Sequence, residues 1–278
     1  MALSIHTNYS SLVTQTNLTK TNNALGANQQ RLGTGLRINS AADDAAGLQI
    51  ATRLNAQSRG MDMAMRNTGD AVSLLQTAEG AFNETTDILQ RMKDLATQAA
   101  NDTNSVDDRA SLQAEYDELA KEVTNIFNNT KYAGEALFTT KLAAPVNFQI
   151  GSSSAETLAF DVSADLTALD TTLNTTIAAF TLDSAANAGT AIDGLETALN
   201  EVGSMRAQFG ANINRLNHTA NNLSNMKDNT DMAKGRIMDA DFAKESANMT
   251  KNSMLMQSGI SMLKQAGQMP GMVMSLLG

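Results

Sequence analysis

The chain has 278 residues, no Cys, no Trp and only two Pro, and its 29 acidic against 20 basic residues give a formal net charge of −9 at pH 7. The absence of Cys excludes disulfide frameworks, thiolate zinc sites, iron–sulfur clusters and Cys nucleophiles, and the acidic balance argues against nucleic acid as a partner, because phosphate binding requires clustered Lys and Arg. No apolar run approaches the roughly 18 to 20 residues that span a bilayer, so we expect no membrane insertion.

The first segment, residues 1–39, is helical in pattern but poor in helix-forming composition. Leu18, Leu25 and Leu32 repeat every seven residues, which is the spacing of a helix that packs along another helix. The segment is rich in Asn, Thr, Ser and Gly, which are weak helix formers. No acidic residue precedes Asp43. We therefore predict that residues 1–39 are disordered in the monomer and become a helix only against a partner.

The next segment, residues 40–139, carries a long seven-residue repeat that predicts a helix over about 42–100. Ser40 and Asp43 have the spacing of a capping box, so we expect the helix to begin there. Residues 101–105 have turn composition, and a second helix with Leu112, Tyr116, Leu119, Val123 and Ile126 on one face is predicted after them. The members of the long repeat are Leu54, Met61, Thr68, Leu75, Phe82, Leu89 and Ala96.

Residues 140–188 differ from both flanks. Residues 146–150 and 158–162 each alternate apolar and polar side chains around a Ser-rich stretch, which predicts a β-hairpin. Thr, Ala, Ser and Asp dominate the residues beyond it. We therefore expect a β-hairpin and a solvated surface region in this part of the chain.

The helical pattern returns in residues 189–235 and continues in 236–278. The first of these carries a second heptad run: Leu195, Val202, Phe209, Leu216 and Leu223. The second repeats Phe242, Met249, Met256 and Leu263 every seven residues, interleaved with Ser246, Ser253, Ile260 and Gly267, and has no acid after Glu245. We predict a mainly α fold, an antiparallel bundle of long heptad-patterned helices with a small β-hairpin region, whose terminal segments are disordered in the monomer and form a coiled coil on assembly.

Groups suited to catalysis are scarce. His6 and His218 have no acidic or His neighbours at ligand spacing, which favours surface or structural roles. Ser261 and Lys264 match the S-x-x-K pattern, but its companion boxes are absent. The Met-rich end could form a soft metal site, and helix packing is the favoured reading because no His lies near it. We therefore expect no catalytic residue, no metal and no cofactor, and predict that the chain is not an enzyme.

Several motifs, in the correct order at both ends of the chain, resemble bacterial flagellin. At the N-terminal end these are residues 35–40, GLRINS, residues 43–47, DDAAG, and residues 89–91, LQR. At the C-terminal end they are residues 214–216, NRL, residues 239–242, DADF, and the closing SLL of 275–277. Few residues lie between the two matched ends, so the chain resembles a short flagellin whose variable outer region is reduced.

The resemblance implies a structural subunit that is secreted by flagellar type III export and polymerises with copies of itself into the extracellular flagellar filament for motility. It also implies an export chaperone that binds the C-terminal segment, and filament cap and hook-junction proteins as partners. A second hypothesis is another type III-exported helical assembly protein, such as a hook–filament junction protein, and a third is a soluble helical signalling or ligand-binding bundle. The matches at 37–40 and 239–242 favour flagellin.

Two sets of functional residues follow. By resemblance, Gln90, Arg91, Leu95 and Glu115 match the motif that is bound by the animal Toll-like receptor that senses flagellin; Asp94 stands where many receptor-active members carry Glu. From the heptad pattern of the two ends, we predict an assembly core of Leu18, Leu25, Leu32, Phe242, Met249, Met256, Ile260 and Leu263.

Overall fold

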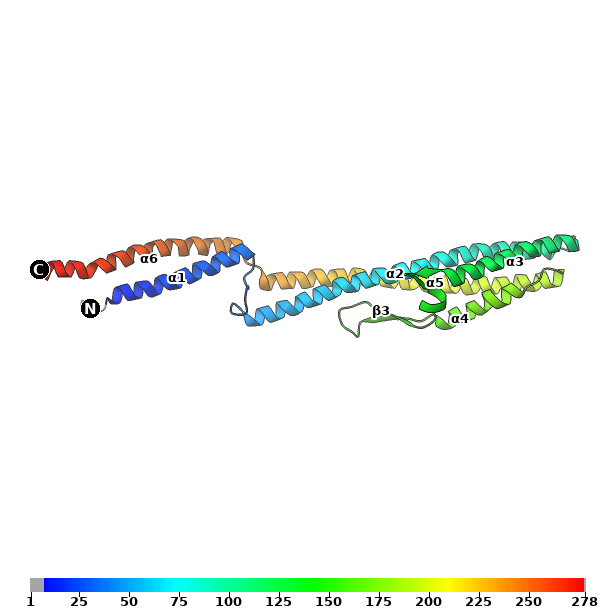
Figure 1. The fold of residues 1–278 in the computed structure, drawn as a ribbon, viewed down its shortest axis with the longest axis horizontal. Coiled ribbons are helices and arrows are strands. Elements are labelled where there is room, and N and C mark those ends of the chain that lie inside the picture. Colours follow the sequence, from blue (N-terminus) through cyan, green and yellow to red (C-terminus); the bar gives the residue numbers. More distant parts are fainter. Residues whose placement is uncertain (1–7, 278) are drawn as a thin grey trace. The chain divides into compact units, whose positions relative to one another are not determined.

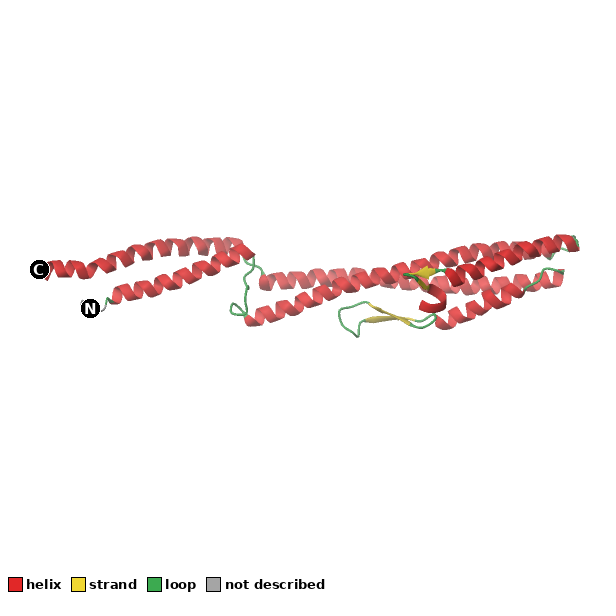
Figure 2. Ribbon diagram, viewed as in Figure 1, coloured by secondary structure: helices red, strands yellow, loops and turns green. Residues whose placement is uncertain are grey.

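A computed structural model describes residues 8–277, with the backbone alone for 269, 270 and 272–277, so His6 lies outside the described residues. The helices are α1 (Tyr9–Thr34), α2 (Ala45–Ala99), α3 (Val106–Asn129), α4 (Ser163–Thr171), α5 (Ala185–Met238) and α6 (Phe242–Leu277). The strands are β1 (Lys131–Tyr132), β2 (Glu135–Ala136), β3 (Val146–Gln149) and β4 (Thr157–Phe160). Short π turns (Leu137–Lys141, Thr172–Thr176) and a 3-10 turn (Ile177–Ala179) complete the fold. The predicted mainly α fold with a small β-hairpin is confirmed (Figure 2).

The chain forms two compact units. The terminal unit comprises residues 8–56 and 229–277 of the described chain, and the central unit comprises residues 57–228. In the terminal unit, α1 and α6 lie side by side and run in opposite directions (Figure 1). No helix in the described part of the chain combines the length and the apolar character that a membrane span requires.

The core of the central unit is built from the predicted heptad repeats. From Met61 to Ala96 every member of the long α2 repeat is buried, and so is the α5 run from Leu195 to Leu223. Helix α3 adds Tyr116, Val123 and other side chains of its apolar face. Because heptads place these residues on one side of each helix, three long helices bury a shared seam.

A chain of phenylalanine rings ties the elements of this core together. The ring centroid of Phe82 on α2 is 4.8 Å from that of Phe138 and 5.6 Å from that of Phe209 on α5. Phe127 on α3 lies 5.1 Å from Phe138, and Phe160 on β4 lies 5.7 Å from Phe209. Contacts at these separations add to the apolar burial of the rings.

The β-hairpin forms where it was predicted, and the residues after it differ from the prediction. Strands β3 and β4 pair antiparallel, with Val146 opposite Phe160 and Gln149 opposite Thr157. Residues 163–179, expected to be a solvated surface, are instead helical and pack on the core. Their polar composition concealed a sparse apolar stripe, whose buried members are Leu166, Leu169, Leu173 and Ile177.

The long helix α2 begins later than predicted. The carboxylate of Asp43 accepts hydrogen bonds from the main-chain N–H of Ser40 (2.9 Å) and of Asn39 (3.1 Å), which close a turn before the helix and lower the pKa of Asp43. The first turn of α2 is capped by Asp44, which accepts from the N–H of Gly47 at 2.8 Å. The capping motif at 40–43 therefore belongs to the connection, because its carboxylate bonds backward along the chain.

Candidate assembly surface

The two terminal helices meet along a thin seam. Half-buried or buried side chains recur at alternating spacings of three and four along both helices, as in a two-stranded coiled coil. At one end of the seam, Nδ2 of Asn8 donates to the carbonyl of Ala266 at 2.7 Å, and at the other an antiparallel bridge joins Leu36 and Asp239. On α1 the seam residues are Ser11, Thr14, Leu18, Thr21, Leu25, Asn28 and Leu32; on α6 they are Glu245, Met249, Asn252, Met256, Gly259, Leu263 and Ala266.

The seam contains most of the predicted assembly core but not all of it. Leu18, Leu25, Leu32, Met249, Met256 and Leu263 lie within it, half-buried, whereas Phe242 and Ile260 are exposed. The predicted companion positions on α6, including Ile260, were displaced by one residue. Within one subunit the seam is filled by the series at 245, 252, 259 and 266, and Ile260 lies beside it on the exposed face.

A polar cluster interrupts the seam near its junction with the rest of the unit. Asn28 and Glu245 are only 6% and 7% exposed. The Arg31 guanidinium lies 3.5 Å from one carboxylate oxygen of Glu245. With its amide oriented to satisfy both neighbours, Asn28 donates to the other carboxylate oxygen at 3.2 Å and accepts from the amide of Asn252 at 3.0 Å. Sequence reasoning missed this cluster, although Glu245 stands out as the last acid of the chain.

Large apolar side chains face outward on both terminal helices. Such exposure is unusual when it is contiguous, because large apolar patches on soluble proteins mark interaction surfaces. The central unit, in contrast, encloses most of its apolar residues in one large core, and its exposed large apolar side chains, Met63, Val106 and Met226, are few for its size. On α1 and on the described side chains of α6, the exposed apolar residues are Tyr9, Leu12, Val13, Phe242, Met254, Leu255, Ile260 and Met262.

The receptor-motif residues lie on the central unit, where the structure brings two of them together. The guanidinium of Arg91 on α2 donates to the carboxylate of Glu115 on α3 at 2.6 and 3.0 Å. Both side chains are about half exposed, and Gln90 beside them is exposed as well. Leu95 is 1% exposed and belongs to the core, so it stands apart from the other three.

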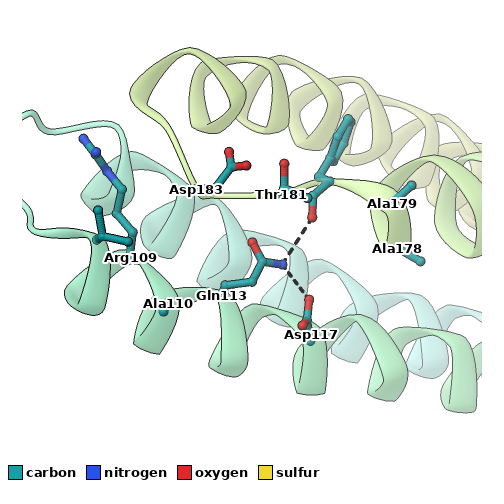
Figure 3. Close-up of a pocket in the computed structure, with 10 residues that line it drawn as sticks. Arg109, Ala110, Gln113, Asp117, Ala178, Ala179, Thr181 and Asp183 are labelled. Atoms are coloured by element: carbon teal, nitrogen blue, oxygen red, sulfur yellow. Dashed lines mark hydrogen bonds between the residues drawn. The ribbon is translucent and has the colours of Figure 1, made fainter.

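A groove of about 420 Å³ lies at the start of α3, against residues 178–183 (Figure 3). The Gln113 side chain reaches across it, donating to the carbonyl of Phe180 at 3.2 Å and to the carboxylate of Asp117 at 2.6 Å. Arg109 at its rim donates to the carbonyl of Ala99 at 2.9 Å. The bond from Gln113 to Phe180 holds the connection into α5 against α3, and the bond from Arg109 holds α3 against the end of α2, so both polar side chains have structural roles.

The residues considered for catalysis are not brought together. His218 is exposed on α5, and the hydroxyl of exposed Ser261 donates to the carbonyl of Gln257 within α6. Within residues 8–277, no group of three or more His, Asp or Glu side chains is placed to hold a metal ion.

Comparison with known proteins relates the chain to one family. The profile of the bacterial flagellin N-terminal helical region matches residues 5–142, and that of the C-terminal helical region matches residues 192–277. A flagellin of Halalkalibacterium halodurans is 42% identical, with 89% of this chain and 90% of that protein covered. A flagellin of Bacillus subtilis is 38% identical (98% and 99% covered), and flagellin A of Vibrio cholerae is 34% identical over the full length of both chains.

Two solved structures are similar as well. Bacillus cereus flagellin is 37% identical, with a TM-score of 0.50 over 57% of this chain and 88% of that chain. A putative flagellar hook-associated protein from Vibrio parahaemolyticus shares the fold, with a TM-score of 0.57 at 16% identity over 71% of this chain and 100% of that chain.

Proposed function

The chain belongs to the bacterial flagellin family and is a structural subunit of the extracellular flagellar filament, and on that premise we propose how its parts serve assembly. The central unit folds within one subunit. Helices α1 and α6 complete their folding when copies of the chain stack and cover their outward apolar faces. The alternative of a hook–filament junction protein is not favoured, because the flagellin profiles match both ends of the chain. The family is structural, and we propose no catalytic role.

The observation that carries this proposal is the contrast between the two units. Fully burying one large apolar side chain contributes about 1.5–3 kcal/mol, and ordering one residue costs about 1–2 kcal/mol of backbone entropy. A two-helix pair with a half-buried seam and outward Leu, Met and Phe side chains has little burial to offset that cost. Contacts between subunits supply the missing burial, and because such contacts need not close on themselves they generate an open helical polymer.

Limited proteolysis tests this coupling of folding and assembly. Residues 8–34 and 242–277 should be cleaved in the monomer and protected in the filament, while the central unit is protected in both. Equal protection of the terminal helices before and after polymerisation would contradict the proposal. Deleting residues 249–278 should abolish filaments in electron micrographs and leave the circular dichroism of the central unit unchanged; a truncated protein that still forms filaments would also contradict it.

We propose that α6 is also the site that the flagellar export chaperone binds before assembly, and that the filament cap and hook-junction proteins are further partners. Exposed Met254, Leu255 and Met262 support the chaperone site, because Met side chains adapt to different partner surfaces. A chain without Cys also suits type III export in an unfolded state. A peptide of residues 240–278 should compete with the full chain for the purified chaperone, and a peptide of residues 8–34 should not.

We propose that the exposed pair of Arg91 and Glu115 is the centre of a surface recognised by the flagellin-sensing Toll-like receptor. The half-exposed pair presents charge of both signs across two helices, and buried Leu95 keeps α2 in place beneath it. R91A should reduce receptor signalling in a reporter-cell assay with monomeric protein. The matched control is K121A, which removes another exposed pair, with Glu118 on α3. Equal signalling by both variants would contradict this assignment.

A further inference from the structure

The apolar pattern of the terminal helices does not by itself define how they align. On α1, Leu18, Leu25 and Leu32 repeat every seven residues, and on α6, Met249, Met256 and Leu263 do the same. If one helix slides past the other by seven residues, about 10 Å at 1.5 Å per residue, leucines still face the same stripe of α6. Two matching heptad stripes therefore allow several registers of similar apolar burial.

Within the seam, between its two ends, the polar cluster is the side-chain feature that occurs once. Glu245 has two partners from α1, the half-buried Arg31 at 3.5 Å and the buried Asn28 at 3.2 Å, and Asn28 is also bonded to Asn252 at 3.0 Å. A slip of seven residues would move Glu245 away from both α1 partners and leave a carboxylate that is 7% exposed without compensation. An unpaired buried charge is strongly unfavourable, whereas a satisfied one contributes little net stability.

We propose that the cluster of Asn28, Arg31, Glu245 and Asn252 selects the register of α1 against α6, and thereby the arrangement of the outward apolar residues that other subunits contact. This inference rests on the proposed pairing of these helices in the filament. Single buried polar residues fix the alignment of coiled coils in the same way, at a cost in stability. Glu245 then determines which register α1 and α6 adopt, and adds little to the stability of their pairing.

Two other features bear on the same alignment. The main-chain N–H of Arg37 donates to the carbonyl of Met238 at 2.6 Å, and that of Ala240 donates to the carbonyl of Gly35 at 2.9 Å. These bonds form between main chains and therefore do not depend on the cluster's side chains. Gly259 admits Leu18, since a Cβ atom there would lie 3.1 Å from Leu18 Cδ1. Replacing the cluster's side chains while keeping the main-chain bonds separates these two contributions, provided that position 259 is the same in all variants compared.

Pairs of introduced cysteines can report the register directly, because the chain has none of its own. G259C is combined with L18C for the observed register and with L25C or S11C for a slip in either direction. Each pair is placed in the unaltered chain, in N28L/E245L, and in the control Q29L/S246L, which adds the same two leucines at exposed neighbouring positions. Filaments are oxidised, and cross-links within one subunit are identified by monomer mobility on a denaturing gel.

We expect the 18–259 cross-link in the unaltered chain and the control, with slipped pairs at about a tenth of its yield or less. In N28L/E245L the slipped pairs should rise about tenfold. Filaments of N28L/E245L that give only the 18–259 cross-link would overturn the register inference alone. Absence of that cross-link from unaltered filaments would overturn the proposed helix pairing itself.

A second pair of variants applies if N28L/E245L forms no filaments. R31E and E245R should each block filament growth, and the exchanged double variant R31E/E245R should restore it, because the two charges meet again in the observed register. Failure of the double variant to restore growth would overturn the inference.

Discussion

Phe82 and Phe242 provide a matched test of whether the central unit determines monomer stability and the terminal unit determines polymerisation. Phe82 is 1% exposed at the centre of the aromatic chain, in contact with Phe138 and Phe209. Phe242 is 58% exposed at the start of α6. The same substitution, Phe to Ala, therefore removes a core side chain in one case and an outward-facing side chain of the terminal unit in the other.

The expected magnitudes follow from burial. F82A leaves a cavity among three elements and should lower the free energy of unfolding of the monomer by about 3–5 kcal/mol. F242A should change it by less than about 0.5 kcal/mol. In the filament, covering the exposed part of Phe242 is expected to contribute about 1–1.5 kcal/mol per subunit, so F242A should raise the critical concentration for polymerisation about tenfold.

Guanidinium unfolding of the monomer, followed by circular dichroism, measures the first quantity, and sedimentation of polymer against total protein measures the second. Equal destabilisation of the monomer by F242A and F82A would contradict the assignment of Phe242 to the assembly surface. An unchanged critical concentration for F242A would contradict it as well.

Four further substitutions probe the central unit. G80A should stabilise the monomer by about 0.5–1 kcal/mol because a Cβ atom at this position meets no other atom. G194A should destabilise it by about 1–3 kcal/mol because its Cβ atom would overlap the Phe180 ring. Equal guanidinium midpoints for the two variants would contradict this. Y116F should cost about 1 kcal/mol in the same assay, because the buried hydroxyl donates to a main-chain carbonyl at 3.2 Å, and a neutral effect would contradict it. Hydrogen bonds from Ser105, the N-cap of α3, hold the pKa of Asp108 below its ordinary value of 3.8. The stabilisation of α3 by Asp108 is therefore complete above pH 3.8 and is lost as the pH falls through the lowered pKa. D108A should remove this pH dependence from the hydrogen-exchange protection factors of the first turn of α3, and an unchanged pH profile in D108A would contradict the prediction.

The helices could be predicted from the sequence because their information is local and repeated. The heptads that end in Ala96 and Leu223 recur over many turns, so one misleading residue does not obscure the period. The Val146–Gln149 strand was equally readable, since alternation over a few residues predicts a half-buried strand. The motifs that match flagellin are local in sequence as well, although those at 35–40 and 239–242 lie at the connections between helices and not on the repeats.

What the sequence did not reveal are the features that depend on a partner element far along the chain. Leu169 and Ile177 look isolated among Thr, Asp and Asn until the rest of the central core packs beside them. The alignment of α1 with α6 belongs to the same class. The stripe through Leu25 and the stripe through Met256 each determined that a helix forms, but a periodic stripe fits its neighbour at every repeat. Only the folded terminal unit, by burying Glu245 beside Asn28, singles out one of those fits.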